Sequence, residues 1–194
     1  LNIKDRYKIV PQMRFYDQIL CDYKPFVMFF NSSNFSSETV NTDINGFRLN
    51  FFKKSLQKLN SFYKESKVNI VIGGSVVFGF GSTSDKYTIS SILSKKTNEV
   101  FLNFGGTAFN SKQEILLFLN FFQKFKLIDK VIIISGANDL YLNYINKNDD
   151  WGNFFFKEKY QNIFGNYNKK RNLFYKVKSY YHKLNKKKNI INSK

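Results

Sequence analysis

Three short runs of apolar, mostly β-branched residues constrain the fold of this chain more than any other feature of its sequence. They are VNIVIGG (residues 68–74), EVFLNFG (99–105) and KVIIISG (130–136). The runs are continuous rather than alternating in hydrophobicity, which is typical of strands buried on both faces of a parallel sheet. Each run ends at glycine, a residue that permits a tight turn after a strand. The sequence therefore predicts three buried parallel strands.

Helical patterns separate these runs. After the first run, Ile89, Ile92 and Leu93 recur at helical spacing. After the second, SKQEILLFLNFFQKF (111–125) predicts a helix, with Ser111 and Glu114 as a capping box. The apolar stripe expected of this helix consists of Ile115, Phe118, Leu119, Phe122 and Phe125. Alternating strands and helices predict βαβ units and a doubly wound α/β sheet.

The segments before the first strand are less regular. Residues 1–45 alternate apolar clusters with the polar stretch NSSNFSSETVNTDING, and they predict an N-terminal extension of short elements and a loop. The following residues predict a helix over roughly 53–65. We assign residues 46–194 to an α/β domain whose last part, 157–194, is a basic segment.

The positive charge is concentrated in that basic segment. The chain has 194 residues and a net charge of +17, and residues 157–194 hold 12 Lys or Arg and one acid. Such a segment suits an anionic membrane surface or nucleic acid, and it equally suits a solvated helix face. No RNP, zinc-finger or KH pattern is present, which argues against nucleic acid, whereas an anionic membrane surface remains open.

Several classes of protein are excluded or disfavoured by the sequence. The single cysteine, Cys21, rules out an internal disulfide and a cysteine metal cluster. No apolar run reaches the roughly 18 residues of a membrane helix. No signal peptide is visible, which favours a cytoplasmic location. GGSVVFGFGS lacks the lysine of a P-loop and the third glycine of a dinucleotide-binding turn, so we expect no cofactor.

Small and polar residues follow each predicted strand. They are Gly73-Gly74-Ser75, the stretch from Asn103 to Ala108, and Gly136-Ala137-Asn138-Asp139. Ligands of open α/β sheets bind at the carboxyl ends of the strands, so these groups are expected to meet if the strands are adjacent. A serine there can act as a nucleophile when a base and oxyanion donors are near. We expect Asp139 to hold the loops together rather than to take part in chemistry.

In this order and spacing the three groups resemble the SGNH (GDSL-type) hydrolase family. IGGSVVFGFG is similar to the first block, with Ser75 at the nucleophile position and Gly74 where Asp is usual. LNFGGTAFNSKQE is similar to the second block, where Ala108 replaces the oxyanion glycine and keeps its N–H. SGAND is similar to the third block, G-x-N-D, with Asn138 as the oxyanion asparagine. The similar stretch covers roughly residues 68–140, and NGFR (45–48) is a further candidate upstream.

The resemblance implies a three-layer α/β/α, flavodoxin-like sheet and a serine ester hydrolase without a cofactor. Its implied substrate is an acylated small molecule, such as a carbohydrate or lipid ester. An O-acyltransferase on the same scaffold stays open, because an acyl-serine can pass to a hydroxyl group instead of water. In all these cases Ser75 is the expected nucleophile.

The fourth block of the family, D-x-x-H, is missing from this sequence. The single histidine is His182, and Ser179 stands three residues before it. Because the chain begins with Leu1, we expect a fragment whose catalytic His and Asp lie beyond Lys194. The alternative is a degenerate relative that does not hydrolyse and binds an anionic partner through its basic segment.

Overall fold

The computed structural model describes residues 3–145, 155 and 162. The chain divides into two compact units, residues 1–155 and 156–194. All the helices and strands below belong to the first unit. His182 and nearly all of the basic segment 157–194 lie outside the described residues. None of the described helices is long and apolar enough to cross a lipid bilayer.

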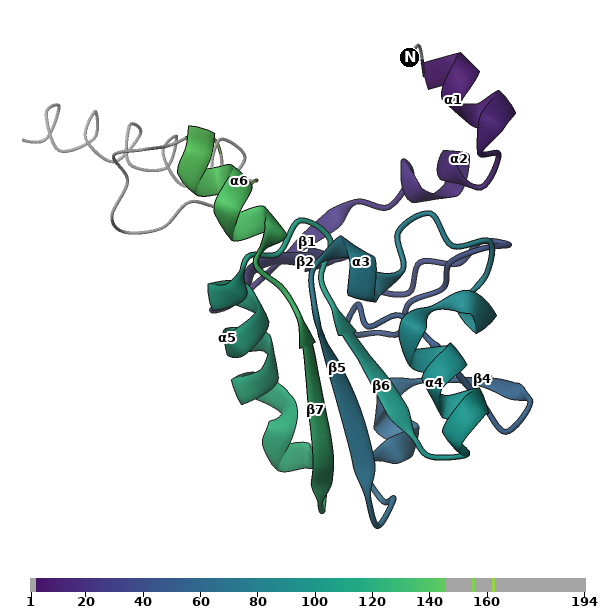
Figure 1. The fold of residues 1–194 in the computed structure, drawn as a ribbon, viewed down its shortest axis with the longest axis vertical. Helices are drawn as coiled ribbons and strands as arrows, with labels where there is room; N and C mark the ends of the chain where they lie inside the picture. The colour runs from purple at the N-terminus through teal and green to yellow at the C-terminus, as the bar shows by residue number, and fades with distance from the viewer. Residues whose placement is uncertain (1–2, 146–154, 156–161, 163–194) are drawn as a thin grey trace, which may run out of the picture. The chain divides into compact units, whose positions relative to one another are not determined.

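A three-stranded parallel sheet forms the centre of this unit (Figure 1). β5 (Val68–Gly73) lies in the middle, with β6 (Phe101–Gly105) on one side and β7 (Ile128–Ile134) on the other. Every residue of β5 is buried, as its continuous apolar sequence predicts. The three predicted strands and their parallel pairing are therefore confirmed.

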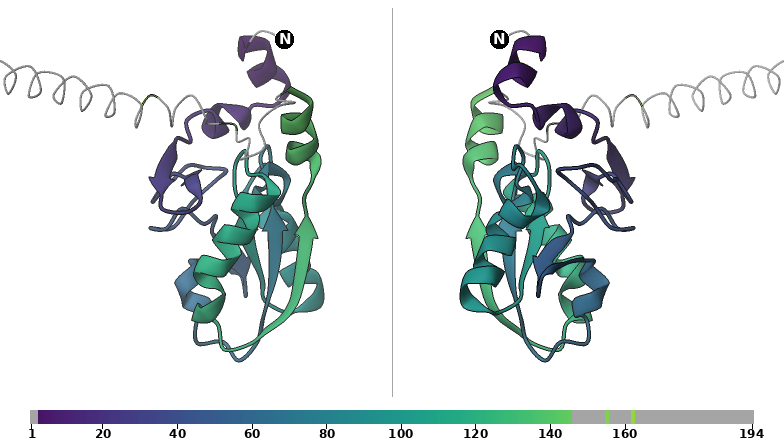
Figure 2. Two further views of the ribbon diagram at one scale, coloured as in Figure 1. Left: turned by 90° about the vertical axis from the view of Figure 1, so that its left-hand side faces the viewer. Right: turned by 90° about the vertical axis from the view of Figure 1, so that its right-hand side faces the viewer.

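Helices cover both faces of the sheet. Ile70 and Ile72 of β5 belong to the main core, together with Leu117 of α5 (Ser111–Phe121). Val71 points the other way and packs in a second cluster against α4 (Ile89–Thr97) and α3 (Ser75–Phe78). Figure 2 shows α5 and α4 on opposite sides of the strands. The chain is thus a mixed α/β protein, as predicted.

The helix α5 is confirmed, but its cap and its buried face differ from the prediction. The observed capping box consists of Asn110 as the N-cap and Gln113. The N-cap is therefore one residue earlier in the chain than the predicted N-cap, Ser111. Leu117 is buried, whereas Ile115 is 58% exposed and Leu119 is 52% exposed. Phe125 of the predicted stripe is buried in the main core and Phe118 packs against it, so the stripe is confirmed in part. Apolar residues lie on most sides of this helix, and periodicity alone does not show which of them the core covers. A short 3₁₀ helix, η3 (Phe122–Lys124), follows α5.

The predicted helix over 53–65 is wrong. The chain forms a hairpin of β3 (Asn50–Phe52) and β4 (Ser55–Gln57), followed by the 3₁₀ helix η1 (Leu59–Phe62). Lys53 and Lys54 form the turn with φ values of 46° and 64°, a left-handed pair that closes a two-residue hairpin. Phe52 and Phe62 are buried in the main core, and their packing outweighs the local helix propensity of this stretch.

Residues 1–45 form part of the same compact unit as the sheet. They contain α1 (Ile3–Ile9), α2 (Met13–Tyr16) and the antiparallel hairpin of β1 (Cys21–Lys24) and β2 (Met28–Asn31). Val27 and Phe30 of this region are buried in the main core. Two further elements complete the unit, η2 (Asp85–Tyr87) and α6 (Ala137–Ile145).

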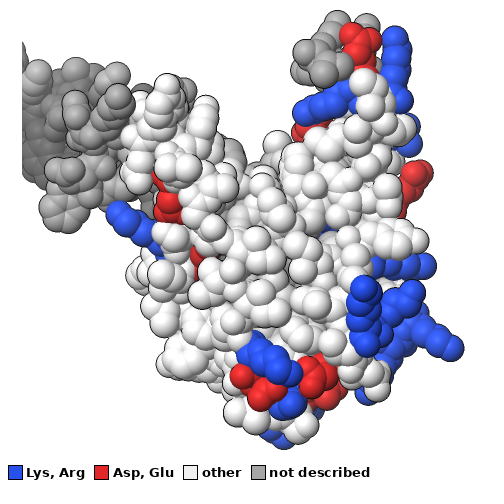
Figure 3. Space-filling model, in the orientation of Figure 1, with Lys and Arg blue, Asp and Glu red and all other residues white. Residues whose placement is uncertain are grey.

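The outer strand β7 is largely exposed, so the prediction that this strand is buried on both faces is wrong. Val131 is 42% and Ile133 is 68% exposed, and no strand among the described residues pairs with the free edge of β7. Figure 3 shows a largely uncharged face, with acidic and basic side chains together at its lower edge. At the amino ends of β5 and β7, Lys67 and Lys130 both lie in ion pairs with Asp129.

Candidate functional site

The carboxyl end of β5 delivers Ser75 to the first position of α3. Ser75 is half-buried. Gly73 is required there, because a Cβ at that position would collide with the carbonyl oxygen of Ile134 in β7. Gly79 ends α3 after one turn in the left-handed conformation, with φ 82°. The sequence Gly-Gly-Ser therefore turns the chain sharply at the edge of the sheet and presents a serine.

Asn138 reaches the same place from the end of β7. It lies in the first turn of α6, and its Nδ2 donates a hydrogen bond of 2.7 Å to the carbonyl oxygen of Phe109. A Cβ at Gly74 would lie 3.0 Å from that same Nδ2. The amide of Asn138 is thus beside the backbone that precedes Ser75. Since an amide nitrogen carries two hydrogens, one N–H remains for a ligand.

The loop after β6 brings Ala108 close to this edge of the sheet in a strained conformation. Its φ of 60° lies in the left-handed region, where glycine is strongly preferred. This conformation gives a physical reason for a glycine at the matching position of the resembling family. The Ala108 N–H has no acceptor within residues 3–145. It is therefore available as a donor.

A small cavity of about 100 Å³ joins these loops. It is lined by Gly74, Ser75, Val76, Phe109, Glu114, Ile134, Ser135, Gly136, Ala137 and Asn138. The structure thus brings Ser75 and Asn138 to one cavity, as their places at two strand ends predict. Ala108 does not line this cavity, although the next residue, Phe109, does.

Glu114 is a site residue that the sequence reading missed. It is 3% exposed and lines the cavity from the first turn of α5. Burial raises the pKa of its carboxyl group, and the nearby charge of Asp139 adds to this rise. A hydrogen bond with the Ser135 side chain lowers the pKa and so opposes part of the rise. The sequence does offer a signal, an acid early in a helix that follows a strand end, but the predicted capping box already accounts for that acid.

Asp139 connects the two helices that border the cavity. Its carboxylate accepts hydrogen bonds from the Ser111 backbone N–H at 3.0 Å and from the Ser111 hydroxyl at 2.6 Å. The start of α6 is thereby fixed to the start of α5. The predicted role of Asp139 in holding the loops together is confirmed.

Two buried asparagines fix the loop after β6, Asn103 of the predicted strand-end groups and Asn31, which was not predicted. Asn31 donates to the carbonyl oxygen of Gly105 and accepts from the Thr107 N–H, at 3.2 and 3.0 Å. Asn103 donates to the carbonyl oxygen of Val77 at 2.8 Å. Because Val77 lies in α3, Asn103 connects the end of β6 directly to the helix that begins with Ser75.

The described part of the site has a serine hydroxyl and N–H donors, and no side chain in the described ranges that could act as a base contacts that hydroxyl. The Ser75 hydroxyl makes no hydrogen bond to any residue in the described ranges. In the part of the chain that the structure describes, no group of three or more His, Cys, Asp or Glu could hold a metal ion. The arrangement therefore suits acyl transfer to a serine once a base is supplied.

No protein-family model matches the chain, and a search of curated proteins also finds no match.

Proposed function

We propose that this chain carries the nucleophile and the oxyanion donors of an SGNH-type serine ester hydrolase. The strand order β6-β5-β7, written in chain order as 2-1-3, is the order with which a flavodoxin-like sheet begins. In such a sheet the carboxyl ends of the central strand and its two neighbours meet at one site. Ser75 and Asn138 come from two of those ends.

The observation that carries the proposal is the position of the Asn138 amide. Its Nδ2 would lie 3.0 Å from a Cβ on Gly74, the residue directly before Ser75. An ester carbonyl attacked by Ser75 develops negative charge on its oxygen, within reach of such an amide. A preorganised donor of this kind typically lowers the barrier by about 2.7–4 kcal/mol. The Ser75 N–H and the Ala108 N–H are the other proposed donors.

The proposed reaction proceeds through an acyl-serine. The Ser75 oxygen forms a bond to the ester carbonyl carbon, its proton passes to a base, and the alcohol leaves with a proton. Water then attacks the acyl-serine and releases a carboxylic acid. No residue in the described ranges contacts Ser75 as a base, and in the resembling family the histidine of D-x-x-H has that role.

The proposed substrate is an acylated carbohydrate or lipid. If a hydroxyl group replaces water in the second step, the same site is an O-acyltransferase. Both activities need the acyl-serine, so both depend on Ser75 and Asn138. Product analysis with and without an added sugar acceptor distinguishes them.

Labelling with a fluorophosphonate probe tests the proposal, together with hydrolysis of p-nitrophenyl acetate. We expect Ser75→Ala to abolish labelling and Asn138→Ala to slow it by about 10²–10³-fold, the usual cost of losing one oxyanion donor. Ser61→Ala, a change at an exposed serine on η1, is the matched control and should label like the unmodified chain. Equal labelling of the Ser75→Ala variant and the unmodified chain, or no labelling of either, would contradict the proposal.

A further inference from the structure

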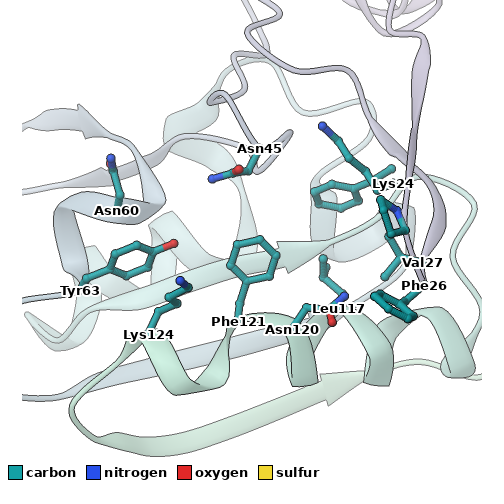
Figure 4. Close-up of a pocket in the computed structure, with 12 residues that line it drawn as sticks. Lys24, Phe26, Val27, Asn45, Asn60, Tyr63, Leu117, Asn120, Phe121 and Lys124 are labelled. Carbon is teal, nitrogen blue, oxygen red and sulfur yellow. The ribbon is translucent and has the colours of Figure 1, made fainter.

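A second and larger cavity lies between the β1–β2 turn, η1 and α5 (Figure 4). Its volume is about 630 Å³, within the range of small-molecule sites. It is lined by Lys24, Pro25, Phe26, Val27, Phe30, Asn45, Asn60, Tyr63, Leu117, Asn120, Phe121 and Lys124. None of these residues lines the cavity beside Ser75, so the two cavities are separate.

The floor of this large cavity is apolar and belongs to the main core. Val27, Phe30 and Leu117 are each at most 2% exposed and belong to the main core. The Phe121 ring packs edge-on against Phe47, with ring centres 4.8 Å apart. A ligand on this floor would therefore meet well-packed hydrocarbon and aromatic surface, which favours an apolar body.

The polar part of the lining is cationic. Among the described residues, Lys24 and Lys124 are the only charged residues that line the cavity, and no carboxylate lines it. Figure 4 shows the Tyr63 hydroxyl and the Asn45 amide directed toward the space above Phe121, with the two lysines at opposite ends of the view. Lys24 donates a hydrogen bond of 2.9 Å to the Ser33 hydroxyl, whereas Lys124 has no ion pair within the described residues.

Asp43 is the acid whose charge affects a lining residue, Tyr63, and the hydrogen-bonding capacity of its carboxylate is taken up by backbone N–H groups. Burial raises the pKa of Tyr63, and the charge of Asp43 raises it further. Asp43 is 2% exposed, and its carboxylate accepts backbone N–H bonds from Asn45, Phe47 and Leu59. Asp43 does not line the cavity and forms no ion pair with either lysine. Within the part of the chain that the structure describes, neither lysine of the cavity is therefore paired with a carboxylate.

We propose that this cavity binds an anionic amphiphile, a carboxylate on an apolar chain. The chain would lie on the floor formed by Val27, Phe30 and Leu117. The carboxylate would meet Lys124, with the Tyr63 hydroxyl and the Asn45 amide as further donors. Apolar burial and charge complementarity both favour this ligand over a neutral or cationic one. The site is independent of Ser75.

Calorimetric titration of the full chain with decanoate tests the site. Decanamide, which has the same chain and no charge, should bind about tenfold more weakly. Lys124→Met should weaken decanoate binding roughly three- to fivefold, because a partly exposed ion pair is lost while the apolar stem is kept. Lys112→Met on α5 is the matched control: about three turns of helix separate the two lysines, and the change should alter binding less than about twofold.

Two further variants locate the binding. Asn120→Trp places an indole at the cavity from an exposed position on α5 and should abolish decanoate binding without affecting the fold. Ser75→Ala should leave decanoate affinity unchanged. The proposal is overturned if decanoate does not bind, if Lys124→Met and Lys112→Met behave alike, or if the Asn120→Trp variant, folded by circular dichroism, still binds normally.

Discussion

Replacement of Asp85 by asparagine should destabilise the unit that holds Ser75 more than any surface change. Asp85 accepts a hydrogen bond of 2.7 Å from Arg48 Nε, and the side chains of both residues are at most 3% exposed. Arg48 also donates to the carbonyl oxygens of Phe78 and Gly79 at 3.0 and 2.8 Å. These carbonyls end α3, so the ion pair supports the helix that begins with Ser75.

The magnitude follows from the burial of this pair. Asparagine keeps the shape of Asp85 but removes its charge, which leaves the guanidinium of Arg48 buried without a counter-charge. Breaking a buried pair in this way typically costs about 3–5 kcal/mol. The free energy of unfolding of an ordinary domain is about 5–15 kcal/mol, so the change should remove roughly a fifth or more of the total. Arg48 then depends on neutral acceptors alone, such as the carbonyl oxygen of Thr39 at 2.7 Å.

Urea unfolding followed by circular dichroism measures this cost. Lys130→Met is the matched control, because it breaks an exposed ion pair with Glu99 and should cost less than about 1 kcal/mol. The double variant Arg48→Met, Asp85→Asn should lose less than the sum of the two single changes. A loss below about 1 kcal/mol for Asp85→Asn would refute the argument, since it would mean that the buried arginine needs no counter-charge.

Three other changes have definite expected outcomes. Gly105→Ala would force a Cβ into the backbone of α3 at Phe78, and it should cost about 3 kcal/mol or more in urea unfolding, whereas a neutral result would contradict this packing. Asn110→Ala removes the cap of α5 and should cost about 1 kcal/mol in the same assay, and an unchanged midpoint would contradict the capping box. Burial gives Glu114 a pKa above its ordinary 4.5, so the folded state holds this proton more tightly than the unfolded state, and stability falls as the pH rises from about 4.5 through the raised pKa. The melting temperature of the Glu114→Gln variant should lack this fall. Identical pH profiles of the melting temperature in the variant and the unmodified chain would contradict the raised pKa.

Local sequence was informative where a segment had a single strong pattern. The runs around Ile70, Leu102 and Ile132 are continuous and β-branched or apolar, and all three became parallel strands. The helix α5 was also predicted, but its buried face only in part, because Leu117 and Leu119 are equally apolar and only the position of the neighbouring sheet distinguishes them. The hairpin at Lys53 and Lys54 was missed because neither residue carries a turn signal.

The candidate site was only partly visible in the sequence. Ser75 and Asn138 stand directly after strands, so their convergence follows once the strands are parallel and adjacent. The pattern around Ser111 and Glu114 predicts only a cap for Glu114. Its burial could not be predicted, because that burial depends on how α5 lies against the loop after β7. Asn31 gave no signal, since it is far along the chain from the Gly105 carbonyl that it contacts.

The amino-acid sequence by itself determined which three segments form the central sheet and which small and polar residues follow each of those strands. These properties depend on neighbouring residues, through backbone conformation and short-range hydrophobic pattern. The tertiary structure alone decided that β5 lies between β6 and β7, that Arg48 pairs with Asp85, and that a cationic cavity forms over Leu117. Those features join residues distant along the chain, and their energy comes from burial and from charge pairing that exist only after the chain has packed.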